Sequence, residues 1–221
     1  MKNKKIFIFI AILLLIIIIF SFFVINKSKT QKIGKNSNSQ EVVDYILNIS
    51  SYEVTINVET KNNKNSNKYI LKQQYIKDKA STQEVLEPSN ISGVKIIKNG
   101  NNLKLENTNL NLNTILENYD YIGNNVLDLN CFIEDYKNSQ DSNYEEKNNE
   151  IIMKTTTNNE NKYTKNKILY IDKSTGNPIK MEITDINQNT TISILYKEVK
   201  IDSLNEENIL AFNLYNMQKE V

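Results

Sequence analysis

The chain has 221 residues, 27 basic and 26 acidic side chains, a formal net charge of +1, and no histidine, tryptophan or arginine. This composition argues against a nucleic-acid-binding protein, which would carry a basic stripe and usually arginine. Without histidine, and with Cys131 as the single cysteine, the chain lacks the usual general base and cannot form an internal disulfide or a multi-cysteine metal cluster. We therefore expect a protein that is not an enzyme and that uses no cofactor or metal.

The first distinctive segment runs from Ile6 to Ile25, where Ser21 is the only polar side chain. A helix of this length spans roughly the 30 Å of a bilayer core. The alternative is a cleaved signal peptide, whose apolar region is usually about 7–15 residues long and ends in small residues. Because this segment is longer, ends in Phe22-Phe23-Val24-Ile25 and has no cysteine nearby to accept a lipid, we predict an uncleaved transmembrane anchor in residues 1–26.

Lysines flank this anchor on both sides, so their number does not set its orientation. A long C-terminal domain is translocated largely regardless of its charge. We therefore expect a single-pass protein of the cell membrane with a cytoplasmic N-terminus and an external domain. The polar, basic residues 27–38 predict a flexible tether between anchor and domain.

The domain is expected to begin with a helix and a series of strands. Residues 39–49 carry apolar side chains at helical spacing, with Ser39 or Gln40 as the cap. Residues 51–60 alternate strictly, which is typical of a half-buried antiparallel strand. Asn99-Gly100 is a hairpin signal between two of the later strands. The further strands are predicted at residues 67–79, 81–86, 94–98 and 102–106.

The middle of the chain predicts two helices, broken near Gly123. Their apolar residues recur at spacings of three and four, and Cys131 is expected as a small buried residue on the second helix. Residues 128–150 hold seven acidic side chains, for which we expect a solvated face or, alternatively, a partner surface. The apolar residues are Leu112, Ile115 and Leu116 in the first helix, and Val126, Leu129, Phe132, Ile133 and Tyr136 in the second.

Four strands are predicted to close the domain, at residues 150–156, 162–172, 178–185 and 190–201. In the last one the apolar positions change phase, which predicts a bulge near Lys197. The order of helices and strands indicates an α+β domain with a strongly curved antiparallel sheet, whose inner face is covered by the helices. The residues expected on that concave face, or at an interface, are Tyr52, Val54, Ile56, Val58, Tyr170, Met181, Ile183, Ile192, Ile194 and Tyr196.

The stretch YIDKSTGNPIKMEITDINQNTTISILYKEVKID, residues 170–202, resembles the C-terminal signature of LolA-like proteins. The turn positions that carry the resemblance are Asp172, Thr175, Gly176 and Pro178, between a strand that ends in Asp and a strand of apolar-charged alternation. The resemblance covers residues 39–213, leaves residues 214–221 as a frayed tail, and implies a half-open barrel with a helical plug.

Within that superfamily the chain is most similar to clostridial germination lipoproteins of the GerS type. That resemblance implies a non-catalytic protein that binds and licenses a spore-cortex N-acetylmuramoyl-L-alanine amidase, in which case the domain could face the intermembrane space of the developing spore. This chain departs from the pattern because it lacks the lipid-accepting cysteine, so the transmembrane helix would replace the lipid. The alternative is a lipid or lipoprotein binder with an apolar cavity in the curved sheet, and a homodimer is left open.

Overall fold

The computed structural model describes residues 33–62, 65–100, 102–107, 109–116 and 125–204. The predicted anchor, most of the predicted tether, the helix break near Gly123 and the C-terminal tail lie outside these residues. Within the described ranges, no helix is both long and apolar enough to span a membrane.

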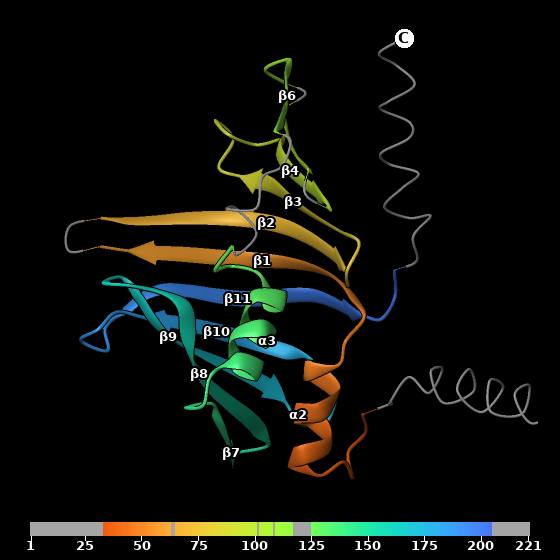
Figure 1. The fold of residues 1–221 in the computed structure, drawn as a ribbon, viewed down its shortest axis with the longest axis vertical. Coiled ribbons are helices and arrows are strands. Elements are labelled where there is room, and N and C mark those ends of the chain that lie inside the picture. Colours follow the sequence, from red (N-terminus) through yellow and green to blue (C-terminus); the bar gives the residue numbers. More distant parts are fainter. Residues whose placement is uncertain (1–32, 63–64, 101, 108, 117–124, 205–221) are drawn as a thin grey trace, which may run out of the picture. The chain divides into compact units, whose positions relative to one another are not determined.

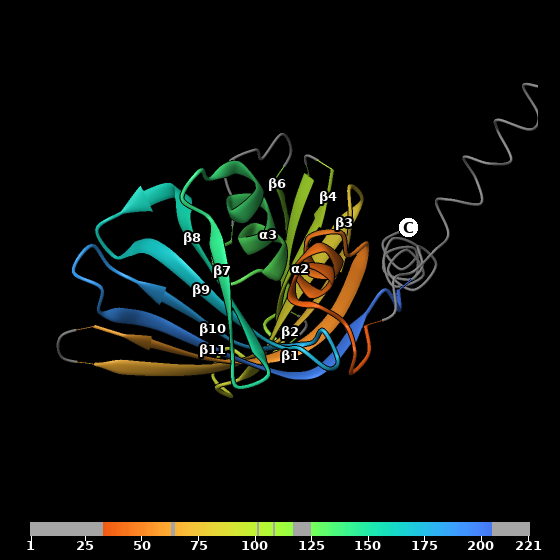
Figure 2. The ribbon, with the colours of Figure 1, turned by 90° about the horizontal axis from the view of Figure 1, so that it is seen from below.

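The eleven strands form a single antiparallel sheet in the order β6-β5-β4-β3-β2-β1-β11-β10-β9-β8-β7. Neighbouring strands in the sheet follow one another in sequence except at the centre, where β1 pairs with β11. The sheet curves around helices α2 and α3 (Figure 1, Figure 2). The elements are α2 (Ser39–Leu47), β1 (Ser51–Lys61), β2 (Ser66–Ile76), β3 (Ala80–Glu87), β4 (Val94–Asn99), β5 (Asn102–Asn107), β6 (Leu112–Leu116), α3 (Leu129–Asn138), β7 (Asn143–Lys147), β8 (Glu150–Asn161), β9 (Thr164–Asp172), β10 (Pro178–Thr184) and β11 (Thr190–Ile201).

Helix α2 begins with a capping box that satisfies two backbone N–H groups of its first turn. The Glu41 N–H donates to Asn38 Oδ1 over 2.9 Å, and the Asn38 N–H donates to Glu41 Oε2 over 3.0 Å. The cap is thus Asn38, and the expectation of Ser39 or Gln40 was wrong by one or two residues. Asn can fill this role as well as Ser because its side-chain oxygen has the same reach.

Strand β1 confirms the predicted alternation, because its four even-numbered apolar side chains from Tyr52 to Val58 are buried and the odd-numbered polar ones from Glu53 to Glu59 are partly exposed. The predicted bulge in the last strand is also confirmed. Lys200 pairs with Glu53 and Lys197 pairs with Thr55, so β11 carries an extra residue between them. Glu198, within this bulge, has a φ of 50°.

In the middle of the chain one prediction was wrong and one strand was not predicted. The segment Leu112–Leu116 is strand β6, paired antiparallel with β5, where a helix was expected. Its apolar spacing fits a short edge strand as well as a helix. The backbone hydrogen bonds of the pairing with β5 favour the strand. Strand β7 was not predicted, because all five of its side chains are exposed and give no apolar period.

The main core lies between α2, α3 and the concave face of the sheet. Both helices pack on β8 and on each other, and their largest buried side chains include Phe132 and Ile46, both fully buried. The second predicted helix is confirmed as α3, with Cys131 buried on it. The α+β class with a curved antiparallel sheet and helices on its inner face is therefore correct for the described residues.

Candidate functional site

The predicted fold-marker turn connects β9 to β10 and is built around Asp172. Its carboxylate accepts hydrogen bonds from the Ser174 hydroxyl and from the backbone N–H groups of Ser174 and Thr175, the last two over 2.8 and 3.0 Å. The bond from the Ser174 hydroxyl is the largest cause that holds the pKa of Asp172 below its usual value, and the backbone bonds add to it. Gly176 has a φ of +72°, and a Cβ there would lie 2.8 Å from the ring of Tyr45 on α2. Pro178 is buried at the start of β10. Thr175 is exposed. The turn therefore docks α2 against the sheet.

The residues predicted for the concave face lie mostly within the core. Seven of them belong to the main buried cluster, Ile192 packs against it, and Ile183 is fully buried. Tyr170 lies on the other face of β9, because its neighbours Leu169 and Ile171 point into the core. There its hydroxyl donates to Glu182 over 3.1 Å and its ring lies under the Lys180 ammonium. Tyr170 is therefore not on the concave face, and its alternative place at an interface stays a prediction. The seven core residues are Tyr52, Val54, Ile56, Val58, Met181, Ile194 and Tyr196.

A buried ion pair, which the sequence did not indicate, joins α3 to β9. Lys167 is fully buried, and its ammonium lies 2.7 Å from Asp135 Oδ2 and 3.1 Å from Cys131 Sγ. The other carboxylate oxygen of Asp135 accepts the backbone N–H of Asn158 over 3.1 Å. The available signal was that Lys167 shares the inward phase of Leu169 and Ile171 on β9.

Cys131 does not have the properties of a catalytic nucleophile. Burial raises the pKa of its thiol, against the lowering effect of the nearby Lys167. Reactive cysteines have lowered pKa values and are accessible to solvent. The Cys131 side chain is therefore part of the packing between α3 and the sheet.

A second polar cluster links the start of α3 to strands β2 and β3. Asp128 Oδ1 accepts from Gln73 Nε2 over 2.9 Å, and Gln73 Nε2 and Asn125 Nδ2 both donate to Gln83 Oε1, over 3.0 and 2.7 Å. The Asp128 residue is partly exposed, but its carboxyl is surrounded by protein atoms. This desolvation raises the pKa of Asp128 to about 7, and the charges of Lys167 and Lys98 only partly oppose it. Gln73 Oε1 is buried without a hydrogen-bond partner.

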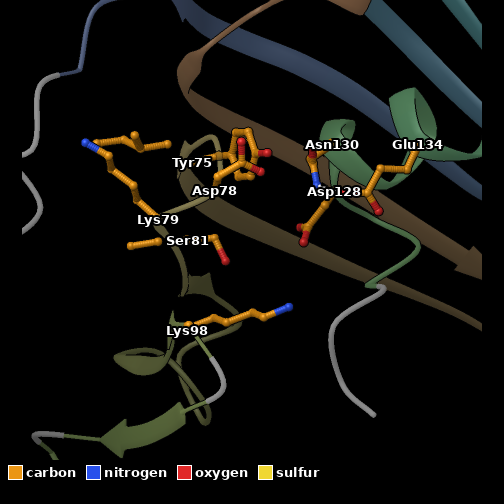
Figure 3. A pocket seen from close by; sticks show the side chains of 11 residues that line it. Tyr75, Asp78, Lys79, Ser81, Lys98, Asp128, Asn130 and Glu134 are labelled. Atoms are coloured by element: carbon orange, nitrogen blue, oxygen red, sulfur yellow. Dashed lines mark hydrogen bonds between the residues drawn. The ribbon is translucent and has the colours of Figure 1, made fainter. Parts of the chain in front are cut away.

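Asp128 also borders an open pocket of about 270 Å³. One wall is the hairpin between β2 and β3, another is the end of β4, and the third is the first half of α3 (Figure 3). The lining is polar and charged, so this pocket differs from an apolar lipid cavity. The labelled side chains of the lining are Tyr75, Asp78, Lys79, Ser81, Lys98, Asp128, Asn130 and Glu134.

The outer edge of β6 is a second candidate for binding. Within the part of the chain that the structure describes, β6 pairs only with β5. Three apolar side chains at this edge are exposed, Leu110 by 68%, Leu112 by 41% and Ile115 by 56%. An open edge with apolar side chains can accept a strand from another chain. The opposite edge, β7, is polar, and its Tyr144 hydroxyl donates to Gln40 Oε1 on α2 over 3.0 Å.

A family model described as "Sporulation protein YdcC-like" matches residues 4–210 of the chain. The chain belongs to this YdcC-like family of sporulation proteins. A comparison with curated proteins found no match. The family assignment agrees with the sporulation setting expected from the sequence.

Solved structures share the fold of this chain to different degrees. An uncharacterized conserved protein from Thermus thermophilus is 12% identical, with a TM-score of 0.51 and coverage of 78% of this chain and 92% of that chain. The GerS lipoprotein from Clostridioides difficile, solved in complex with the CwlD amidase, is 26% identical, with a TM-score of 0.48 and coverage of 74% and 96%. A LolA superfamily protein from Nitrosomonas europaea is 13% identical, with a TM-score of 0.40 and coverage of 77% and 96%. The two groups that the sequence resembles are thus both among the similar structures.

Proposed function

We propose that this YdcC-like protein acts in sporulation as a non-catalytic binding protein whose partner is a cell-wall N-acetylmuramoyl-L-alanine amidase. The observation that carries this proposal is the group of exposed apolar side chains Leu110, Leu112 and Ile115 at β6, a strand that pairs only with β5 among the described residues. The class of partner comes from the GerS lipoprotein, which was solved with the CwlD amidase.

The partner would add an extended segment to β6 as a twelfth, antiparallel or parallel strand. Backbone hydrogen bonds would give the affinity, and the apolar side chains would give the selectivity. Within the described residues, the chemistry of the domain favours binding over catalysis, because its cysteine is buried with a raised pKa. The predicted anchor in residues 1–26 would hold the domain at the membrane where such an amidase works, with the domain external or in the space around the developing spore.

The test is co-purification of the amidase with the full-length protein solubilised from sporulating cells. Ile115→Lys places a charge on the exposed edge without disturbing the core, so we expect it to abolish recovery of the amidase. Ile186→Lys is the matched control, because Ile186 is also exposed, by 59% against 56% for Ile115, but lies in the turn between β10 and β11. If a folded amidase fails to co-purify with the unsubstituted protein, the proposal is wrong.

The lipid-binding alternative stays a prediction. The apolar part of the concave face that was expected to hold a lipid is packed against α2 and α3. The pocket that does open beside α3 is lined by charged groups. Native mass spectrometry of the gently purified protein would detect a bound lipid.

A further inference from the structure

The pocket beside α3 is separate from the edge of β6 and has its own electrostatic character. Its walls carry the carboxylates of Asp78, Asp128 and Glu134 and the amine of Lys98, whereas the side chain of Lys79 leads away from the pocket. The carboxylates come from the β2–β3 hairpin and from α3, and Lys98 comes from β4. The pocket therefore presents three carboxylates and one ammonium, from different walls.

Among the described residues, none of the three carboxylates forms an ion pair, and neither does Lys98. Figure 3 shows the Lys98 side chain extending across the pocket toward Asp128 on the opposite wall. Since the two groups are too far apart for an ion pair, the space between them can take a molecule that contacts both.

Asp128 is the carboxylate that a positively charged group of such a molecule would stabilise most. Protein atoms crowd its carboxyl although the residue is partly exposed at the pocket, and the bonds from Gln73 and Asn125 are both directed at Oδ1. Charged hydrogen bonds in such surroundings are about twice as strong as neutral ones. A ligand ammonium at Asp128 would supply the positive charge that the neighbouring protein groups do not place within contact distance.

We propose that this pocket binds a small diamino carboxylic acid, with one ammonium at Asp128, its carboxylate at Lys98, and the second ammonium at Asp78 or Glu134. The hydroxyls of Ser81 and Tyr75 lie in the same lining and can accept or donate further hydrogen bonds. The class follows from the charges, because two ammonium groups and one carboxylate complement carboxylates on two walls and the single ammonium of Lys98. This inference does not depend on the amidase proposal, because the two use different surfaces.

The test is isothermal titration calorimetry of the full-length protein in detergent micelles at pH 8, with L-lysine as the probe. We expect saturable binding with a dissociation constant on the order of 1 mM, as for a ligand held by two or three charge-assisted bonds. Cadaverine, which lacks the carboxylate, and glutarate, which lacks the ammonium groups, should bind at least about tenfold more weakly. Equal binding of cadaverine would show that Lys98 does not contact the ligand, and it would contradict the proposed ligand class.

Two substitutions on opposite walls make the test independent of any one variant's folding. Lys98→Met and Asp128→Asn should each weaken L-lysine binding at least about tenfold, and circular dichroism verifies that each variant is folded. Lys68→Met is the control, because Lys68 is an exposed lysine on β2 outside the pocket. Absence of L-lysine binding to the unsubstituted protein, or unchanged binding in both pocket variants, would show that the inference is wrong.

Discussion

Two groups of strands in the sheet are packed differently. In the covered half, β1 and β8–β11, inward side chains pack against α2 and α3 and form the main core. In the open wing, β3–β6, only Val85 packs against that core among the described residues, while Ile97 and Leu103 are buried outside it. The covered half thus derives its stability from burial, whereas the open wing depends more on strand pairing and leaves surface for partners.

The comparison also separates two kinds of polar group. In the covered half, Lys167 and Asp135 are both buried and satisfy each other. At the boundary with the open wing, Asp128, Gln73 and Gln83 form a cluster that leaves one buried oxygen without a partner. The ion pair of the covered half is thus fully paired, whereas the cluster at the boundary keeps a buried oxygen that lacks a hydrogen-bond partner.

The largest expected effect is in the covered half. Lys167→Met leaves Asp135 buried and without its cation, so we expect a loss of about 3–5 kcal/mol in the free energy of unfolding. Lys154→Met is the control, since its ammonium also lies 2.7 Å from a carboxylate, that of Glu145, but both side chains are exposed. Urea unfolding of the full-length variants measures both. Similar losses in the two variants would contradict the importance of burial.

The second largest effect is expected where the covered half meets the open wing, in the pH dependence of the free energy of unfolding. Because the pKa of Asp128 rises to about 7 from its ordinary value of 3.8, the folded protein binds a proton there that the unfolded chain releases. The free energy of unfolding should therefore fall as pH rises from about 4 to about 7, by at most on the order of 4 kcal/mol. Asp128→Asn should lose that part of the slope and be the more stable protein at pH 8. Urea unfolding at several pH values tests this, and an unchanged slope would count against it.

A smaller effect is expected at the turn that docks α2. Gly176→Ala combines a left-handed backbone with a contact of 2.8 Å to the Tyr45 ring, so we expect a loss of about 2–3 kcal/mol. Gly100→Ala, in the open wing, has a φ of +55° but no atom within 4 Å of the new Cβ, and should lose only about 1 kcal/mol. Thermal unfolding of the pair measures the difference, which would vanish if the packing of Tyr45 contributed nothing.

The smallest effect on stability belongs to the edge of the open wing. Ile115→Lys changes an exposed side chain, so the free energy of unfolding should change by less than about 0.5 kcal/mol. The same substitution should nevertheless abolish amidase recovery, which separates binding from folding. A large loss of stability would mean that this edge supports the fold and would weaken the proposal for β6.

Local patterns predicted the covered half well. The alternation of Tyr52 to Val58, the hairpin near Asp172 and the bulge beside Lys197 all follow from local periodicity and turn chemistry, which act within a few residues. The secondary structure at the edge of the open wing was harder to predict. The spacing of Leu112, Ile115 and Leu116 fits a helix or a short strand, and only pairing with β5 distinguishes them.

The sequence by itself determined the absence of histidine, the α+β class and the phase of the central strands, because composition and periodicity are properties of the chain alone. The tertiary structure decided which polar residues come together. Lys167 meets Asp135 across 32 positions in the sequence, and Lys98 faces Asp128 from a different wall of the pocket. Such encounters depend on how the sheet curves and where α3 lies on it, and no short-range pattern records that geometry.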